Sequence, residues 1–256
     1  MSDIEIKSTV IKSAVREKYG EIARNSGSCC GPTCGCGTDA GIAGTITMND
    51  LYSGVDPEVR ESADLGLGGG TPTAFADIEE GMTVLDLGSG AGIDVFVAAK
   101  KVGPRGRVIG VDMTEEMIKR AEANKAKLKA ANTEFRLGEI ENLPVSPGSV
   151  DRIISNCVIN LVPDKGRAFA EMYRVMKPGG KFTVSDIVSV GRIPEDIRKD
   201  LAEWAGCVAG ALDREEYLGI ARATGFRDVT VVSDKPYTLD VTVRFGLHSI
   251  TVSGTR

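Results

Sequence analysis

The sequence predicts an α/β fold with a parallel, doubly wound sheet, and three observations lead to this prediction. Short apolar segments typical of buried strands alternate with helical segments from residue 84 onward. A glycine-rich turn joins the first of these strands to its helix, as in β-α-β units. The chain has 256 residues, 42% of them hydrophobic, which suffices for one large core with a smaller appendage.

The strands are predicted from short apolar runs bounded by turn residues. They span residues 84–87, 107–112, 134–137, 150–156 and 181–188, with two more near 226–232 and 246–252.

The helices are predicted from apolar spacing and from end signals. Residues 4–23 carry apolar side chains at i, i+4 spacing, and Thr114 is placed to cap a helix with two glutamates in its first turn. Pro194 opens a helix that continues toward Ala211. Further helices are expected over 92–101, over 167–176 with its end at Pro178-Gly179-Gly180, and over 214–224.

Composition excludes several classes of function. The net charge is -5 without a Lys/Arg cluster, which argues against nucleic acid as a partner. No apolar run approaches the ~18 residues of a membrane span, so no membrane association is expected. The charged first residues lack a signal-peptide core, so we expect a cytoplasmic chain with reduced thiols. His248 is the single histidine, which leaves little for histidine-based chemistry.

The glycine-rich turn spans residues 86–92 and indicates a cofactor site. Glycine permits a sharp turn and lets a ligand approach the helix N-terminus. A dinucleotide fingerprint would need glycine at position 93, which is Ile93. The turn instead suits S-adenosylmethionine, which has no pyrophosphate and whose α-ammonium fits the Asp86 carboxylate. Asp112 ends the second strand, where it can bind both ribose hydroxyls, and Met113 can pack on the adenine.

The six cysteines are Cys29, Cys30, Cys34, Cys36, Cys157 and Cys207. Cys157 ends the fourth strand beside the expected cofactor, although a buried cysteine acting as a small hydrophobe is an equal alternative. In the helix expected after Pro194, Ile197, Leu201, Trp204 and Val208 form an apolar stripe, and Cys207 lies roughly 90° around the helix axis from its centre. This position argues against a role for Cys207 in core packing alone.

Four thiols within residues 29–36 lie in a glycine- and proline-rich loop that no packing requirement explains. This density favours binding of a soft ion. Zinc is the rival, but paired C-x₂-C ligands across a spacer are missing, and the adjacent Cys29 and Cys30 cannot easily reach one ion.

Over residues 75–190 the chain resembles the class I S-adenosylmethionine methyltransferases, in the segments VLDLGSGAG, IGVD and VMKPGGKF. This resemblance implies a Rossmann-like, seven-stranded, mostly parallel sheet. Over nearly its whole length the chain also resembles the arsenite methyltransferase family. The segments that carry this resemblance are REKYGEIAR, the SCCG loop, SNCVINLVPDK and WAGCVAGAL. That resemblance implies arsenic(III) binding by Cys157, Cys207 and a third thiolate from Cys29 or Cys30. The cofactor residues expected from the turn and from the resemblance are Tyr19, Gly20, Asp86, Gly88, Ser89, Gly90, Gly92, Asp112, Met113, Glu139, Ile140 and Asn156.

The function expected is methyl transfer to cysteine-bound arsenic, with arsenite or its glutathione conjugates as substrate and glutathione or thioredoxin as reductant. The main task of the enzyme in such a reaction is to position the arsenic against the methyl group of the cofactor. No general base is needed, because the attacking arsenic atom carries no proton. The alternatives are a carbon or oxygen methyltransferase of small metabolites and a non-catalytic metalloid sensor. Three parts are expected: residues 1–70 as a helix and Cys/Gly-rich cap, 71–190 as the cofactor core, and 191–256 as acceptor helices and last strands.

Overall fold

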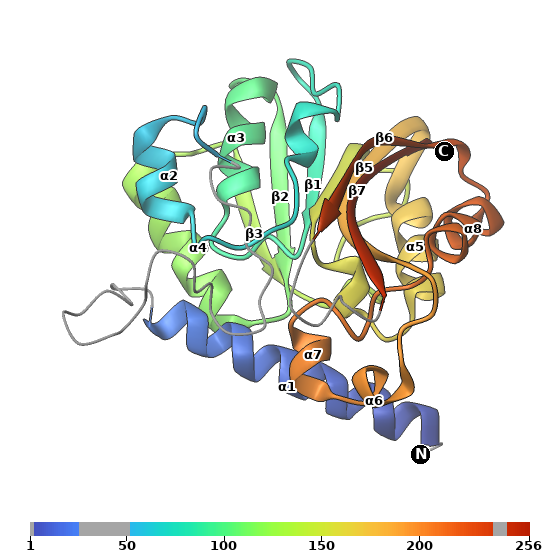
Figure 1. Cartoon of the computed structure of the whole chain (residues 1–256). Coiled ribbons are helices and arrows are strands. Elements are labelled where there is room, and N and C mark those ends of the chain that lie inside the picture. Colours follow the sequence, from blue (N-terminus) through green and yellow to red (C-terminus); the bar gives the residue numbers. More distant parts are fainter. Residues whose placement is uncertain (1–2, 26–51, 238–244) are drawn as a thin grey trace.

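The computed structural model describes residues 3–25, 52–237 and 245–256. Within these ranges seven strands form one sheet in the order β3-β2-β1-β4-β5-β7-β6 (Figure 1). The first five in this order are parallel, whereas β7 is antiparallel to β5 and β6. The predicted seven-stranded, mostly parallel sheet is confirmed. The strands are β1 (Thr83–Leu87), β2 (Arg107–Asp112), β3 (Thr133–Leu137), β4 (Val150–Asn156), β5 (Met176–Val190), β6 (Arg227–Tyr237) and β7 (Gly246–Thr255).

Helices cover both faces of the sheet (Figure 1). Because side chains alternate along a strand, Leu85 and Leu87 of β1 join Phe169 in the core under α5 and α8, while Val84 joins Val95 in the core under α3. The helices are α1 (Asp3–Asn25), α2 (Pro57–Ala63), α3 (Ile93–Val102), α4 (Glu115–Leu128), α5 (Lys165–Val175), α6 (Glu195–Arg198), α7 (Leu201–Ala205) and α8 (Arg214–Thr224), with short 3-10 turns η1 (Pro72–Ala74) and η2 (Ile159–Leu161).

Helix α1 lies across the end of the sheet where the parallel strands finish, in contact with α4 and α7 (Figure 1). Ile11 and Val15 are buried in this contact, as their spacing predicts. Val10, another apolar residue of the same i, i+4 pattern, is exposed. Among the described helices, none is long and apolar enough to cross a membrane.

The region after Pro194 differs from its prediction. Two short helices, α6 and α7, replace the single helix, and Leu201 of the expected apolar stripe is exposed. The Asp200 side chain accepts a hydrogen bond from the Ala202 backbone N–H at 2.7 Å, which starts a new helix instead of continuing the old one. Cys207 then follows α7 with a left-handed φ of 68°.

The start of α4 and the end of α5 also differ from their predictions. Thr114 occupies the N-cap position of α4, but its side chain makes no capping bond, and its backbone N–H instead donates to Asp112 Oδ1 at 2.9 Å. Helix α5 ends at Val175, one residue before β5 begins, so Pro178-Gly179-Gly180 lie inside β5 at a register irregularity opposite β4 and do not end the helix.

Candidate active site

A pocket lies at the carboxyl ends of β1, β2 and β4, where ligands of open α/β sheets bind. Its walls come from α1, the segment 52–68, the β1–α3 turn, the end of β2, the loop after β3 and the segment after β4. Cys207 closes the pocket from the segment that follows α7. Six chain segments that are distant in sequence therefore meet the pocket together with Cys207.

The turn between β1 and α3 needs its glycines. Gly88, Gly90 and Gly92 have φ angles of 66°, 51° and 97°, a region that favours residues without a Cβ. A Cβ on Gly88 would lie 2.5 Å from the Val158 side chain. The Gly90 N–H donates to Asp112 Oδ2 at 3.0 Å, so the carboxylate at the end of β2 also fixes the turn.

Three carboxyl groups make this part of the pocket acidic. Burial raises the pKa of Asp86 well above its usual range, and the neighbouring Asp94 and Asp112 carboxylates raise it further. Burial also raises the pKa of Asp94, to about 6, and that of Asp112. None of the described residues donates a hydrogen bond to the Asp86 carboxylate, although Asp86 is only 3% exposed. Because burial and the neighbouring carboxylates oppose the ionisation of Asp86, a cationic ligand beside it would stabilise the charged form of this carboxyl group.

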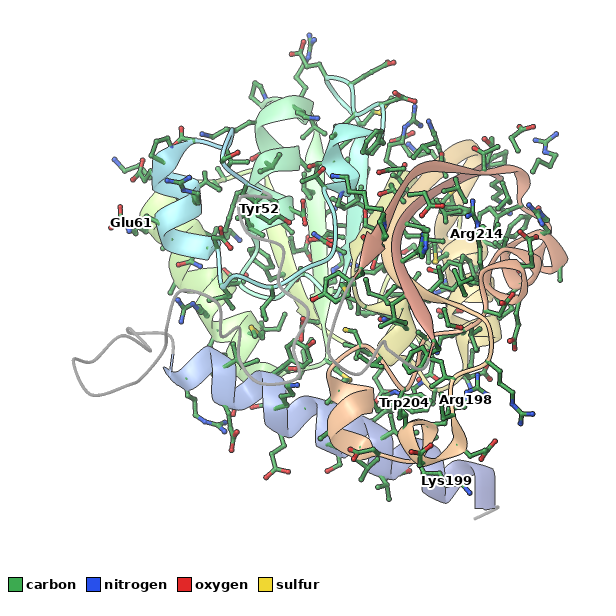
Figure 2. The ribbon with its side chains drawn as sticks, viewed as in Figure 1. Tyr52, Glu61, Arg198, Lys199, Trp204 and Arg214 are labelled. Carbon is green, nitrogen blue, oxygen red and sulfur yellow. The ribbon has the colours of Figure 1, made fainter. Side chains whose placement is uncertain are left out.

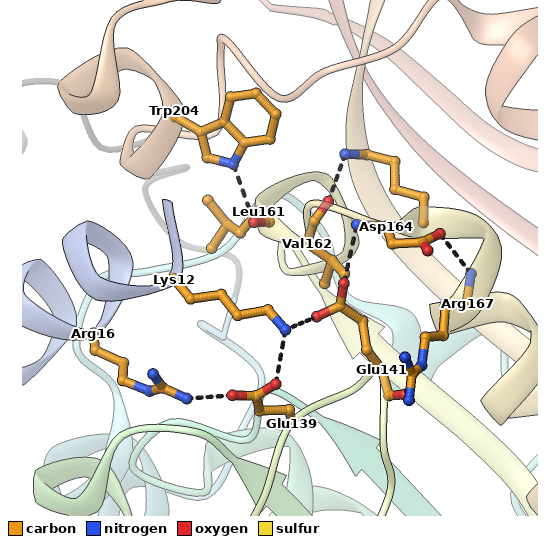
Figure 3. Close-up of polar contacts among 10 residues, drawn as sticks. Lys12, Arg16, Glu139, Glu141, Leu161, Val162, Asp164, Arg167 and Trp204 are labelled. Atoms are coloured by element: carbon orange, nitrogen blue, oxygen red, sulfur yellow. Dashed lines mark hydrogen bonds and ion pairs between the residues drawn. The ribbon is translucent and has the colours of Figure 1, made fainter. Parts of the chain in front are cut away.

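Helix α1 is held against the pocket by a charged clasp, which we define as Lys12, Arg16, Glu139 and Glu141 (Figure 3). Lys12 Nζ lies 2.7 Å from Glu139 Oε2 and also pairs with Glu141, while Arg16 pairs with Glu139. Both glutamates belong to the loop after β3, so the clasp joins α1 to that loop. Lys12, Glu139 and Glu141 themselves line the pocket.

The two described thiols meet at the other end of the pocket. Cys157 and Cys207 are unoxidised and buried, and Cys207 Sγ lies 3.5 Å from the Cys157 carbonyl oxygen, to which it donates. A hydrogen bond with Cys207, together with burial, raises the pKa of the Cys157 thiol well above its usual range. Tyr19 of α1 brings its hydroxyl to 4.0 Å from Cys207 Sγ. Both cysteines have left-handed backbones, with φ of 60° and 68°, which is uncommon for residues other than glycine.

Asn156 links the acidic end of the pocket to the thiol end. Its Oδ1 accepts bonds from the Gly69 and Gly70 N–H groups at 3.0 and 3.1 Å, and its Nδ2 donates to the Gly70 carbonyl and the Tyr52 hydroxyl. The Tyr52 hydroxyl in turn donates to Asp94 Oδ2 at 2.6 Å. Tyr52 approaches from the α2 side of the molecule, far along the chain from β4 (Figure 2).

Most residues predicted for the site line the pocket. They are Tyr19, Asp86, Gly88, Ser89, Gly90, Asp112, Met113, Glu139, Ile140, Asn156, Cys157 and Cys207. Gly92 lies just outside, at the N-cap of α3, and Gly20 of α1 faces Arg24 of the same helix and Glu116 of α4. Cys29 and Cys30, like Cys34 and Cys36, lie outside the described residues. Within the described residues, no group of three His, Cys, Asp or Glu side chains could hold a metal ion.

Among the pocket residues that were not predicted, three polar ones make side-chain bonds within the site. Asp94 stands in the first turn of α3, directly after the glycine turn, and an acidic residue at that position could have drawn attention to it. Tyr52 and Lys12 carry no comparable local signal, because their importance depends on partners 42 and 127 residues away.

Comparison with known proteins agrees with the fold. Residues 78–225 match the methyltransferase domain family. The match covers more than half of the chain and includes the glycine turn, the acidic end of β2 and both described cysteines. The chain therefore belongs to the methyltransferases.

Within that family, the chain belongs with the arsenite methyltransferases. It is 46% identical over 230 residues to the arsenite methyltransferase of Halobacterium salinarum and 37% identical over 233 residues to that of Aquipseudomonas alcaligenes. These matches cover 86% and 88% of the chain, which spans 58% and 65% of the two relatives' lengths. The crystal structure of CrArsM, an arsenic(III) S-adenosylmethionine methyltransferase from Chlamydomonas reinhardtii, superposes with a TM-score of 0.70 at 37% identity, covering 80% of this chain and 72% of that one.

Proposed function

We propose that this protein transfers the methyl group of S-adenosylmethionine to trivalent arsenic bound by Cys157 and Cys207. The observation that carries the proposal is the meeting of these two thiols, from segments 50 residues apart, at the end of a pocket whose other end is acidic. The named activity of the relatives from Halobacterium salinarum and Aquipseudomonas alcaligenes supports the same reaction.

The acidic end of the pocket fits the cofactor. Asp86 offers a buried, unpartnered carboxylate for the α-ammonium, and Asp112 stands at the strand end where ribose hydroxyls are bound in such folds. Met113 and Ile140 offer apolar surface for the adenine. When bound there, S-adenosylmethionine supplies an electrophilic sulfonium methyl group. Tyr19 of α1 covers the space between the cofactor end and the thiols.

The thiol end suits a neutral metalloid hydroxide. The raised pKa of Cys157 keeps its thiol protonated near neutral pH. A divalent metal needs thiolates and would have to displace those protons. Arsenous acid, As(OH)₃, instead condenses with protonated thiols, each As–S bond forming as one As–O bond breaks and one water leaves. Capture of arsenic by this route places no net charge in the site. A neutral product suits two thiols as deeply buried as these, because burying an unpaired charge is costly.

The third sulfur in our proposal comes from Cys29 or Cys30. Three sulfurs on one side of arsenic leave its lone pair free for in-line attack on the methyl carbon. The attacking atom carries no proton, so positioning supplies the rate enhancement. The lone pair becomes the new As–C bond and leaves arsenic formally pentavalent. A thiol reductant such as glutathione or thioredoxin must then return two electrons as two thiols become a disulfide.

The test is incubation of the reduced protein with arsenite, S-adenosylmethionine and glutathione, followed by speciation of arsenic. Methylated arsenic and one S-adenosylhomocysteine per methyl group are expected. Cofactor binding without arsenic methylation would contradict the proposal. In that case, cofactor consumption with a small carbon or oxygen acceptor would indicate a metabolite methyltransferase, and arsenite binding without turnover would indicate a sensor.

A further inference from the structure

Cys157 and Cys207 lie in separate segments, yet both are fixed by consecutive residues of β5. The Cys157 N–H donates to the Ser185 carbonyl at 2.7 Å. Asp186, the next residue, accepts the backbone N–H of Asn160 at 3.0 Å, and the Asn160 side chain reaches Cys207. One strand therefore sets the position of both thiols, directly for Cys157 and through Asn160 for Cys207.

Asn160 is itself held on both sides. Asp186 Oδ2 accepts its N–H and also the hydroxyl of Tyr217 at 3.1 Å. On the other side, Lys165 Nζ donates to the Asn160 carbonyl at 3.2 Å and to the Val162 carbonyl at 3.0 Å. Asn160, Asp186 and Lys165 are all buried, so none of these bonds competes directly with solvent. The backbone of η2 is thus a fixed platform.

From this platform the Asn160 amide, Nδ2, donates to the Cys207 carbonyl oxygen at 2.9 Å. Cys207 needs such support, because its φ of 68° lies in a region disfavoured for a residue with a Cβ. The following segment also rests on Asn160, since a Cβ on Gly210 would overlap the Asn160 carbonyl oxygen. Asn160 is not among the residues that line the pocket.

We propose that Asn160 is a positioning residue that holds Cys207 at chelating distance from Cys157 through the bond from its amide to the Cys207 carbonyl. This inference rests on the proposed function only in taking the two thiols as the arsenic site. Asn160 touches neither substrate nor cofactor, so its loss should weaken two-thiol binding and leave the acidic end of the pocket unchanged.

The test measures chelation by the thiol pair without methyl transfer. Phenylarsine oxide condenses with two thiols and releases one water, so its affinity reports whether both sulfurs reach one arsenic. Serine replaces the four cysteines of residues 29–36, which leaves Cys157 and Cys207 as the only thiols. Trp204, the only tryptophan, lies three residues before Cys207 and donates to the Leu161 carbonyl next to Asn160, so its fluorescence follows binding.

In this background Asn160→Ala should weaken phenylarsine oxide binding by about tenfold or more, because binding must then restore the disfavoured backbone of Cys207 that the amide bond holds in the parent protein. S-adenosylmethionine affinity should stay within about twofold, since its pocket residues are untouched. Should Asn160→Ala fail to fold, Asn160→Leu serves in its place, because it nearly keeps the size of the side chain and has no donor for the Cys207 carbonyl.

The matched control is Asn132→Ala. Asn132 also donates its amide to backbone carbonyls, those of Ala99 and Gly103 at 2.9 and 3.0 Å, but it precedes β3 at the opposite end of the sheet. It should lower stability without changing phenylarsine oxide affinity. Equal weakening in both variants, or unchanged affinity in the Asn160 variants, would overturn the positioning role. Failure of the proposed function is distinct from this, because a parent protein that does not methylate arsenite still gives the chelation result.

Discussion

The clasp between α1 and the loop after β3 allows a quantitative prediction for Lys12→Met. Lys12 and Glu141 have side chains that are 18% and 8% exposed, so the pair is largely desolvated. Removing the lysine leaves Glu141 with the Asp164 N–H, 3.1 Å away, as its remaining hydrogen-bond donor among the described residues. Breaking a buried pair costs about 3–5 kcal/mol and an exposed one about 0–1 kcal/mol. We expect a loss of about 2 kcal/mol in the free energy of unfolding for this intermediate case.

Arg24→Met on the same helix is the matched control. Arg24 pairs with Glu116 at 2.5 Å, but the two side chains are 53% and 35% exposed, so its loss should cost below about 1 kcal/mol. Both substitutions remove one cation from α1, and only the first breaks the clasp. Because Lys12 and Tyr19 line the pocket, loosening α1 should also weaken S-adenosylmethionine binding by about tenfold in Lys12→Met alone.

Denaturant unfolding and calorimetric cofactor titration at neutral pH measure both effects. The pH is suitable because the pKa of Lys12 is raised: burial lowers it, but the bonds and charges of Glu139 and Glu141 outweigh burial. The contribution of Lys12 is therefore complete below its ordinary pKa and is lost only as the pH rises through the higher folded value. Equal stability losses in the two variants, or a Lys12→Met protein with unchanged cofactor affinity, would refute the assignment of α1 as a clasped wall of the pocket.

Asp112→Ala should weaken cofactor binding by about 1.5–3 kcal/mol in calorimetry, and unchanged affinity would remove Asp112 from the site. Cys157→Ser should abolish arsenic methylation while cofactor binding persists; normal turnover would make Cys157 a packing residue. S-adenosylmethionine affinity should rise with pH up to about 6, where Asp94 ionises, and Asp94→Asn should flatten that profile. The Cys29→Ser, Cys30→Ser double variant should lose most activity on arsenite yet methylate monomethylarsonous acid, which needs only two sulfurs; equal losses on both substrates would assign these thiols another task.

The sequence predicted the sheet because each strand carries a local signal. A parallel sheet brings the carboxyl ends of its strands to one edge, so Asp86, Asp112, Asn156 and Cys157 could be placed near one another before any contact was known. The break between α6 and α7 was missed because it depends on the single Asp200 side-chain bond, which competes with a continuous apolar pattern.

The clasp and the platform under Cys207 could not be predicted from the sequence. Lys12 bonds Glu139 across 127 residues, and Asn160 bonds Cys207 across 47. Buried polar partners of this kind have no periodicity to indicate them, since each bond is defined by the folded geometry of two separate segments. The roles of Cys29 and Cys30 stay predictions, because these residues lie outside the described ranges.

The charge distribution of the pocket gives a direction to the proposed reaction. S-adenosylmethionine carries one net positive charge and its product S-adenosylhomocysteine carries none, whereas Asp86, Asp94 and Asp112 remain where they are. The buried carboxylates therefore attract the donor more strongly than the product, because only the donor carries a sulfonium charge in addition to its α-ammonium group. The pKa of all three acids is raised, that of Asp94 to about 6, so protonation of these groups in the pocket without a cation competes with donor binding. As the methyl group is transferred, the positive charge of the sulfonium passes to the thiol-bound arsenic and so moves away from the acids, and the spent product is held less tightly than the donor that replaces it.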